Sequence, residues 1–182
     1  LKNNLRYRLT YTWLARAVVA NSESTRRTLV QSAPWLERQR LEVIYNGVDP
    51  RLFEGWPDPE LRATWGCGDR CRVVGFVGQL DERKGIQILL PAFERVAARV
   101  PRARLVLVGR GPLASLVERF QKNSPVGGRV VLAGFQRDIP RIMRSIDVLV
   151  LPSLWEGFGI VLIEAMAAGK PVVASDVSSI PE

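Results

Sequence analysis

The chain has 182 residues, of which 47% are hydrophobic, enough for one well-packed domain or for one domain with part of another. It contains no apolar run of the roughly 18 to 20 residues that cross a bilayer, and its first residues lack the uninterrupted apolar core of a signal peptide. We therefore expect a cytoplasmic protein without a membrane span.

The net charge of +8 is concentrated near the N-terminus. Residues 1–40 carry eight Lys or Arg and two acidic residues, a net charge of +6. This asymmetry indicates contact with an anionic membrane surface, which would make the protein peripheral to a membrane; a solvated helix face is the alternative. Nucleic acid is not an expected partner, because no recognition helix, zinc module or aromatic RNA-binding signature accompanies the charge.

Cys67 and Cys71 are the only cysteines, and the chain has no histidine. The two thiols cannot complete the usual four-ligand zinc site. We expect reduced thiols in a loop and no metal site.

The first 71 residues are expected to form a separate part of the chain. Either Ser22 or Ser24 can cap a helix, and the elements predicted around it are a helix over 7–16, a strand over 17–21 and a strand over 41–49 that ends in an Asn-Gly turn. These elements are too few to bury their own faces, so residues 1–45 are expected to be the tail of a preceding domain. Residues 46–71 contain three prolines and are typical of a linker.

From Arg72 onward, strands and helices alternate. Pro91 is expected to kink or break the first helix. The strands are continuous Val, Leu and Ile runs, which indicates burial on both faces and a doubly wound parallel α/β sheet, Rossmann-like in type. The predicted strands are 72–78, 103–109, 129–134, 147–153 and 171–176, and the predicted helices are 85–100, 112–123, 139–146 and 159–168. Because the sequence stops just after a strand, we expect it to be truncated at both ends.

Ligands of such sheets bind beyond the carboxyl ends of the strands. In "GFVGQLDERKG" (75–85), Arg83 and Lys84 stand at a helix start, where two cations and free amides suit a diphosphate; a solvated basic turn is the alternative. In "VLVGRGPLA", Gly109 and Gly111 follow a strand and approximate a dinucleotide fingerprint. The acidic residue expected about 20 positions later is missing, which argues against a nicotinamide cofactor.

The stretch "LWEGFGIVLIEAMAAGKPVVASD" (154–176) places Glu156 before a predicted helix and Glu164 inside it. A buried carboxylate is costly unless it is paired. The first amides of the helix suit an anion, and they belong to Phe158, Gly159 and Ile160. Two carboxylates on either side of a bound phosphate could accept hydrogen bonds from the hydroxyls of two flanking sugars. A structural salt bridge is the alternative.

The stretch "EGFGIVLIEAMAAGKPVVASD" resembles the glutamate-x7-glutamate signature of GT-B glycosyltransferases, especially the retaining family 4 enzymes. The resemblance extends over nearly the whole chain. "VVANSESTR" and "VIYNGVDPRLF" look like the end of the acceptor domain and the crossing into the donor domain. The segments "GFVGQLDERKG", "LVLVGRGP", "VVLAGF" and "DVLVLPSLWEGFG" follow in the family's order.

The resemblance implies a retaining glycosyltransferase fragment that binds a nucleoside-diphosphate sugar and, in an intact parent, transfers the sugar to an acceptor hydroxyl. Residues 1–45 would be a remnant of the acceptor domain, 46–71 the interdomain linker and 72–182 an incomplete donor domain. A GT-B sugar-nucleotide epimerase and a non-catalytic sugar-nucleotide-binding module are the alternatives. The nucleotide sugar is a substrate, and neither a cofactor nor a metal is implied.

The resemblance also implies roles for individual residues. Lys84 would hold the diphosphate, with Arg83 beside it and the amides of Gly159 and Ile160 as further donors. Glu156 would contact the transferred sugar and Glu164 the ribose hydroxyls, so that Glu156 and Lys84 are the catalytic residues. The remaining donor-binding residues would be Gly78, Gly109, Gly111 and Phe158, with the loop 134–138 near the base.

Two departures from the family pattern affect these expectations. Gln79 stands where family members commonly carry an arginine that binds phosphate, which predicts weaker donor binding unless Arg83 compensates. The first domain, which forms the acceptor half of the cleft in this fold, is missing from the sequence. The 182 residues alone are therefore expected to bind the donor without transferring the sugar.

Overall fold

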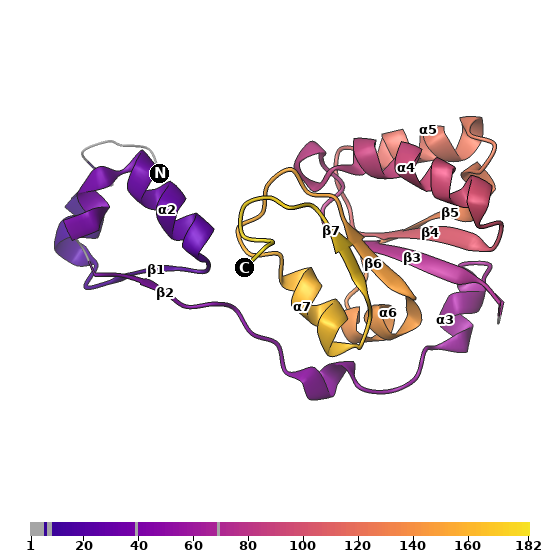
Figure 1. Cartoon of the computed structure of the whole chain (residues 1–182), viewed down its shortest axis with the longest axis horizontal. Coiled ribbons are helices and arrows are strands. Elements are labelled where there is room, and N and C mark those ends of the chain that lie inside the picture. The colour runs from indigo at the N-terminus through magenta and orange to yellow at the C-terminus, as the bar shows by residue number, and fades with distance from the viewer. Residues whose placement is uncertain (1–5, 7–8, 39, 69) are drawn as a thin grey trace. The chain divides into compact units, whose positions relative to one another are not determined.

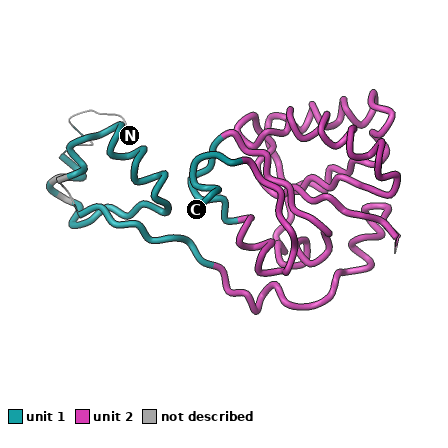
Figure 2. Tube along the Cα trace, viewed as in Figure 1, with its two compact units in different colours: residues 1–47, 155–160, 176–182 teal, residues 48–154, 161–175 magenta. Residues whose placement is uncertain are grey.

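The computed structural model describes residues 6, 9–38, 40–68 and 70–182. The chain divides into two compact units (Figure 2). Unit 1 consists of residues 1–47, 155–160 and 176–182, and unit 2 of residues 48–154 and 161–175.

Unit 2 is built around a five-stranded sheet in the order β5-β4-β3-β6-β7 (Figure 1). Every neighbouring pair of strands is parallel, so all five carboxyl ends meet at one edge of the sheet and all five amino ends at the other. This arrangement confirms the predicted parallel sheet. The strands are β3 (Arg72–Val77), β4 (Ala103–Val108), β5 (Val130–Gly134), β6 (Val148–Leu151) and β7 (Val172–Ala174).

Helices cover both faces of this sheet, as the doubly wound fold requires (Figure 1). Helices α4 (Ile86–Arg99) and α5 (Ala114–Asn123) lie on one face, and α6 (Ile139–Ser145) and α7 (Ile160–Ala167) on the other. Helix α3 (Pro59–Thr64) packs against α6. The core lies between the sheet and the helices on its two faces. Its fully buried side chains include Phe76, Phe93, Leu105, Leu107, Met143 and Leu149.

Of the two effects predicted for Pro91, a kink or a break, the break is wrong, because α4 continues through this residue to Arg99. A proline removes one backbone hydrogen bond from a helix interior. Pro91 is exposed on the outer face, whereas the inner face of α4 buries apolar side chains against the sheet. Burying several large apolar side chains stabilises the helix by more than the lost hydrogen bond costs. The buried residues are Ile86, Leu89, Leu90, Phe93 and Ala97.

Unit 1 contains a two-stranded parallel sheet of β1 (Val18–Ala20) and β2 (Leu41–Val43). Strand β2 stops earlier than the sequence predicts, before the Asn-Gly pair. Helix α2 (Glu23–Ser32) joins the strands, followed by a 3-10 helix, Pro34–Arg38. The predicted cap is confirmed, since the Ser22 hydroxyl accepts a hydrogen bond from the Thr25 amide at 2.9 Å.

The predicted helix over 7–16 is present as far as Leu14: Leu9 is α-helical and Thr10–Leu14 form a π-helix. Its first two positions, Tyr7 and Arg8, lie outside the described residues. None of the helices among the described residues combines the length and the apolar character needed to cross a membrane.

The expectation of reduced thiols is also wrong, because Cys67 and Cys71 form a disulfide. The chain turns sharply after α3, which brings the two Cα atoms to 5.3 Å, a separation that a disulfide can bridge. The loop follows Trp65, whose side chain is buried. The disulfide forms because the turn brings Cys67 and Cys71 close together, and the spacing of the two cysteines in the sequence did not reveal this turn.

Candidate functional site

Three loops meet at the carboxyl ends of β3, β4 and β5. The Gly78 amide donates a hydrogen bond to the Val108 carbonyl at 3.0 Å, and the Gly109 amide donates to the Gly134 carbonyl at 2.8 Å. The first hydrogen bond joins the loop after β3 to the end of β4, and the second joins the loop after β4 to the end of β5. The structure therefore brings together two of the predicted glycines and the start of the predicted 134–138 loop.

Glycine is required where these loops touch. Gly109 has a φ of 141°, and a Cβ at this position would overlap the carbonyl oxygen of Gly78. A Cβ on Gly111 would overlap the carbonyl oxygen of Leu80, which lies 2.9 Å from the Leu113 amide that donates to it. The predicted glycines thus allow two backbones to pack in direct contact.

A cavity of about 290 Å³ opens between these loops. One wall carries Arg110, whose guanidinium carbon lies 5.3 Å from the centre of the Phe135 ring. This pair forms a cationic and aromatic surface over a mostly apolar hollow. The lining residues are Val77, Gly78, Gln79, Val108, Gly109, Arg110, Phe135, Gln136 and Ile139. Sequence reasoning missed Arg110, although its position between two close-packed glycines was the available signal.

Asp81 organises the loop that carries the two predicted cations. Its carboxylate accepts hydrogen bonds from the Lys84 amide at 3.0 Å and from the Arg83 guanidinium at 3.0 Å. Burial alone would raise the pKa of Asp81, but the hydrogen bonds from Arg83 and from the Lys84 amide outweigh it and lower the pKa below its usual value. Asp81 therefore balances the charge of Arg83.

The Lys84 side chain is half-buried and runs beside Gly78: its Cε lies 3.9 Å from the position that a Gly78 Cβ would occupy. The loop is also tied to the end of the β6 segment, because the Leu154 amide donates to the Arg83 carbonyl at 2.7 Å. Lys84, Gly78 and Gly109 are thus neighbours at this edge of the sheet.

Glu164 lies half-buried on α7. Burial raises the pKa of its carboxyl group. Within the described part of the chain, no residue forms an ion pair or a side-chain hydrogen bond with it, so the alternative of a salt bridge is not realised there. This carboxylate can accept hydrogen bonds from a ligand.

In unit 1, the segment 155–160 is held by hydroxyl groups. The Gly157 carbonyl accepts hydrogen bonds from Ser22 at 2.8 Å and from Thr25 at 3.0 Å. The Glu156 side chain is buried, and its backbone carbonyl accepts a hydrogen bond from the Ser179 hydroxyl at 3.2 Å. The predicted residues of this unit are Glu156, Phe158, Gly159 and Ile160; the others belong to unit 2.

The Phe158 ring lies 6.2 Å from the ring of Tyr45, also in unit 1. Gly159 has a φ of 78° just before α7 begins at Ile160. Glycine adopts this left-handed conformation at no steric cost. The conformation of Gly159 sets the direction in which the first backbone amides of α7 point. As for metals, the described residues contain no group of three or more His, Cys, Asp or Glu that could ligate an ion.

Comparison with known proteins places this geometry in a family. Residues 71–182 match the model of the glycosyl transferases group 1 family. The chain is 37% identical over 149 residues to an uncharacterized glycosyltransferase of Methanocaldococcus jannaschii, and the aligned region covers 79% of this chain and 38% of that protein. It is 30% identical over 142 residues to the N-acetyl-α-D-glucosaminyl L-malate synthase of Bacillus anthracis, and the aligned region covers 78% of this chain and 37% of that protein.

Solved structures show the same fold. HepE of Anabaena in complex with UDP-glucose superposes with a TM-score of 0.83 at 30% identity, covering 98% of this chain and 50% of that one. The glycosyltransferase WaaG superposes with a TM-score of 0.77 at 22% identity, which shows the fold alone; it covers 98% of this chain and 51% of that one. The chain spans about 40% of the length of the relatives named above. Its sheet, its glycine-lined loops and these matches agree that the chain belongs to the glycosyl transferases group 1 family and has the GT-B fold.

Proposed function

We propose that this chain is the donor-binding half of a retaining family 4 glycosyltransferase that uses a nucleoside-diphosphate sugar. The observation that carries the proposal is the similarity to HepE, a protein solved with UDP-glucose, across 98% of this chain at 30% identity. In an intact parent, the sugar would pass to an acceptor hydroxyl supplied with the help of a second domain.

The cavity of about 290 Å³ supports this proposal as the place for the base and ribose. It is concave and mostly apolar, and a few polar groups border it, as in other small-molecule sites. Phe135 offers a ring face, and the Arg110 guanidinium beside it adds a cation. The loop 134–138 would then lie near the base.

Lys84 would bind the diphosphate, because its side chain runs beside Gly78 at the rim of the same cavity. Arg83, whose charge is balanced by Asp81, would contribute less than the sequence suggests, and Gln79 would not replace a phosphate-binding arginine. The amides of Gly159 and Ile160 would add donors. Catalysis would consist of positioning and of cationic stabilisation of the departing nucleoside diphosphate, without a metal.

The two carboxylates would bind hydroxyl groups. Glu164, half-buried and without an ion pair among the described residues, would accept hydrogen bonds from the ribose hydroxyls. Glu156 would contact the transferred sugar. Glu156 and Lys84 would then be the catalytic residues, in the sense that both touch the reacting part of the donor.

The remaining expectations belong to this proposal. Residues 1–45 would derive from the acceptor domain, residues 46–71 would link the domains and residues 72–182 would form the donor domain. The chain alone would bind the donor without transferring sugar. The parent would be a cytoplasmic enzyme of glycan biosynthesis that touches an anionic membrane through its basic N-terminal segment; liposome co-sedimentation with no dependence on anionic lipid would contradict that contact.

The experiment that tests the proposal is a thermal-shift titration of the chain with UDP, GDP and ADP. At least one nucleotide should raise the melting temperature, and Lys84→Ala should abolish the shift. Lys122→Ala is the matched control, since Lys122 is an exposed lysine on α5 and should leave the shift unchanged. A folded chain whose melting temperature responds to no nucleotide at millimolar concentration would contradict donor binding.

The comparisons favour neither of the two alternatives, a GT-B sugar-nucleotide epimerase and a non-catalytic sugar-nucleotide sensor. Incubating an intact parent with the donor separates them from a transferase. An epimerase converts the donor when no acceptor is present, and a transferase consumes the donor only when an acceptor is present. A sensor binds the donor and converts it under neither condition.

A further inference from the structure

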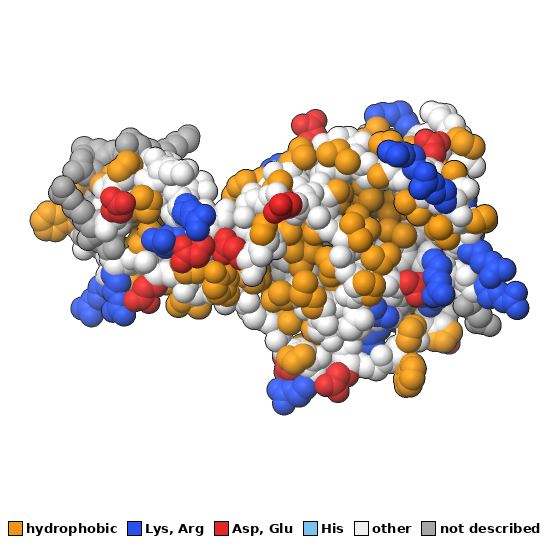
Figure 3. Space-filling view, viewed as in Figure 1, with side chains coloured by type: hydrophobic (Ala, Val, Ile, Leu, Met, Phe, Trp, Pro, Cys, Tyr) orange, Lys and Arg blue, Asp and Glu red, His pale blue; other side chains and the backbone are white. Residues whose placement is uncertain are grey.

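Six arginines gather at the edge of the sheet opposite the candidate donor site, where the strands begin. Figure 3 shows Lys and Arg side chains gathering over the part of unit 2 that carries the end of α4 and the starts of β3 and β4. This set, here called the arginine edge, consists of Arg70, Arg72, Arg99, Arg102, Arg104 and Arg129.

The arginine edge is concave. Two hollows of about 480 and 460 Å³ open there, and Arg70, Pro101 and Arg102 line both. Because they share these residues, the hollows adjoin each other. No acidic residue is among the described residues that line them. A ligand in either hollow would therefore face several guanidinium groups and no described carboxylate.

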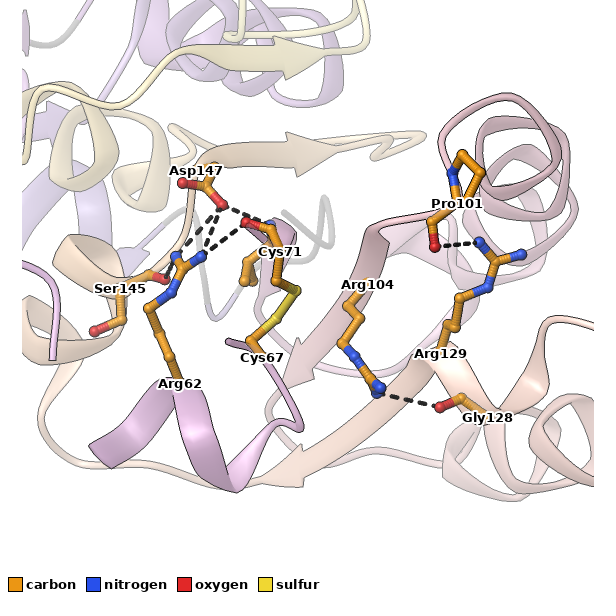
Figure 4. The surroundings of a disulfide bond; sticks show 10 residues. Arg62, Cys67, Cys71, Pro101, Arg104, Gly128, Arg129, Ser145 and Asp147 are labelled. Atoms are coloured by element: carbon orange, nitrogen blue, oxygen red, sulfur yellow. Dashed lines mark hydrogen bonds and ion pairs between the residues drawn. A yellow bond between two sulfur atoms is a disulfide. The ribbon is translucent and has the colours of Figure 1, made fainter. Parts of the chain in front are cut away.

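Two of the arginines are fixed by backbone carbonyls (Figure 4). Arg104 donates to the Gly128 carbonyl at 3.2 Å, and its guanidinium would lie 3.1 Å from a Cβ at Gly66. Arg129 donates to the carbonyls of Ala97 at 2.9 Å and of Pro101 at 3.1 Å, at the end of α4. A guanidinium has five N–H donors, so each still has donors for a ligand.

The other four arginines of the edge are exposed, and within the described part of the chain none of the six forms an ion pair. Other surface arginines of the chain do pair locally, as Arg51 does with Asp49. Like charges held close together repel one another and lower stability unless counter-charges bind. The edge thus presents a preformed excess of positive charge.

We infer that the arginine edge is a second anion site, for a ligand that carries two or more phosphate groups. Guanidinium forks match phosphate oxygens in bidentate geometry, and two adjoining hollows suit two phosphates of one molecule. The ligand is either a free oligophosphate or the phosphorylated head group of a lipid. The site is separate from the donor site, because a six-residue strand such as β3 puts about 20 Å between the two edges.

The test is isothermal titration with inorganic tripolyphosphate in the Lys84→Ala background, where the proposed donor site is disabled and no nucleotide is needed to fill it. We expect one site, with an affinity that falls as salt is added. The double variant Arg70→Gln/Arg102→Gln removes the two arginine side chains that both hollows share. The backbone hydrogen bond from the Arg72 amide to the Arg102 carbonyl does not involve the side chain and is retained. It should weaken binding about tenfold or more.

The matched control is Arg95→Gln/Arg119→Gln, which removes two exposed arginines outside the hollows and changes the net charge equally. It should bind tripolyphosphate within about twofold of the chain that carries Lys84→Ala alone. A second arm measures co-sedimentation with vesicles of phosphatidylcholine that contain phosphatidylinositol 4,5-bisphosphate or none. Binding of tripolyphosphate supports a free ligand, and binding only of phosphatidylinositol 4,5-bisphosphate vesicles, weakened in the first variant, supports a lipid.

Two results would overturn the inference. One is the absence of binding in both arms by a folded chain. The other is equal weakening in the two double variants, which would mean that only overall charge matters. Neither result depends on the donor site, because Lys84→Ala disables that site in the titrations and no nucleotide is present.

Discussion

Gly109 lies so close to the carbonyl oxygen of Gly78 that no Cβ fits between them. The ends of β3 and β4 are held together at this point by backbone contact alone. The part of the candidate cavity's wall formed by Gly78 and Gly109 is therefore backbone, and a larger residue at position 109 must move one strand end relative to the other.

We expect Gly109→Ala to lower both stability and nucleotide binding. The methyl group would meet the Gly78 carbonyl, and the φ of 141° is unfavourable for alanine. Together these effects should cost about 2 kcal/mol or more in free energy of unfolding. Urea denaturation measures the stability, and a UDP titration of the folded fraction measures the binding.

Gly128→Ala is the control for this change. A Cβ at Gly128 meets no atom within 4 Å, and its φ lies outside the left-handed range. Its unfolding free energy should differ from that of the unchanged chain by less than about 0.5 kcal/mol. Equal losses in the two variants would show that the contact with Gly78 is not what matters.

We expect Glu164→Gln to raise the melting temperature of the unliganded chain at pH 7. Burial raises the pKa of Glu164 in the folded state, so ionisation at neutral pH costs folding free energy that a neutral amide avoids. In the unfolded chain the carboxyl group of Glu164 has the ordinary glutamate pKa of about 4.3, and well below that pH the group is protonated in both the folded and the unfolded state. The gain should therefore be present at pH 7 and disappear by about pH 4. A gain that grows on acidification would contradict this account.

Arg62→Ala should destabilise unit 2 by about 2 kcal/mol. The Arg62 guanidinium donates to the carbonyls of Ser145 at 2.8 Å and Cys71 at 2.9 Å, and it pairs with Asp147 at 3.4 Å (Figure 4). Alanine would leave these acceptors unsatisfied in a partly buried place. Urea denaturation at pH 7 checks the loss, with Arg95→Ala as a control that should change stability by less than about 0.5 kcal/mol.

Removing the disulfide through Cys67→Ser/Cys71→Ser should lower the unfolding free energy by about 2 kcal/mol, the chain-entropy value for so short a loop. The same loss should follow when a reductant is added to the unchanged chain. The two conditions should not add, because a reductant has nothing to reduce in the double variant. A reductant that lowers the stability of both proteins equally would show that its effect does not come from this disulfide.

The sequence predicted most of the sheet of unit 2, because buried parallel strands have an unmistakable composition. The Val and Leu runs of β3 and β4 and the helical spacing of α5 identify these elements without knowledge of their neighbours. The failure at Pro91 has a different cause. Whether a proline ends a helix depends on how much apolar surface the rest of the helix buries, which only the packed structure shows.

The candidate site was less accessible to sequence reasoning. Gly109 and Gly111 could be identified because a glycine pair after a strand signals close backbone contact. The pairing of Arg83 with Asp81 and the approach of Arg110 to Phe135 depend on side-chain directions that no local pattern fixes. The arginine edge was hidden for a related reason, since its members are spread over 60 residues of sequence and meet only at the ends of separate strands.

Because all five strands run in the same direction, the sheet has two chemically independent ends. At physiological ionic strength, electrostatic interactions decay over about 8 Å, well short of the length of β3. Two anions could occupy opposite ends at once without sensing each other's charge. Selection or engineering could therefore retune one end while the chemistry at the other stayed intact.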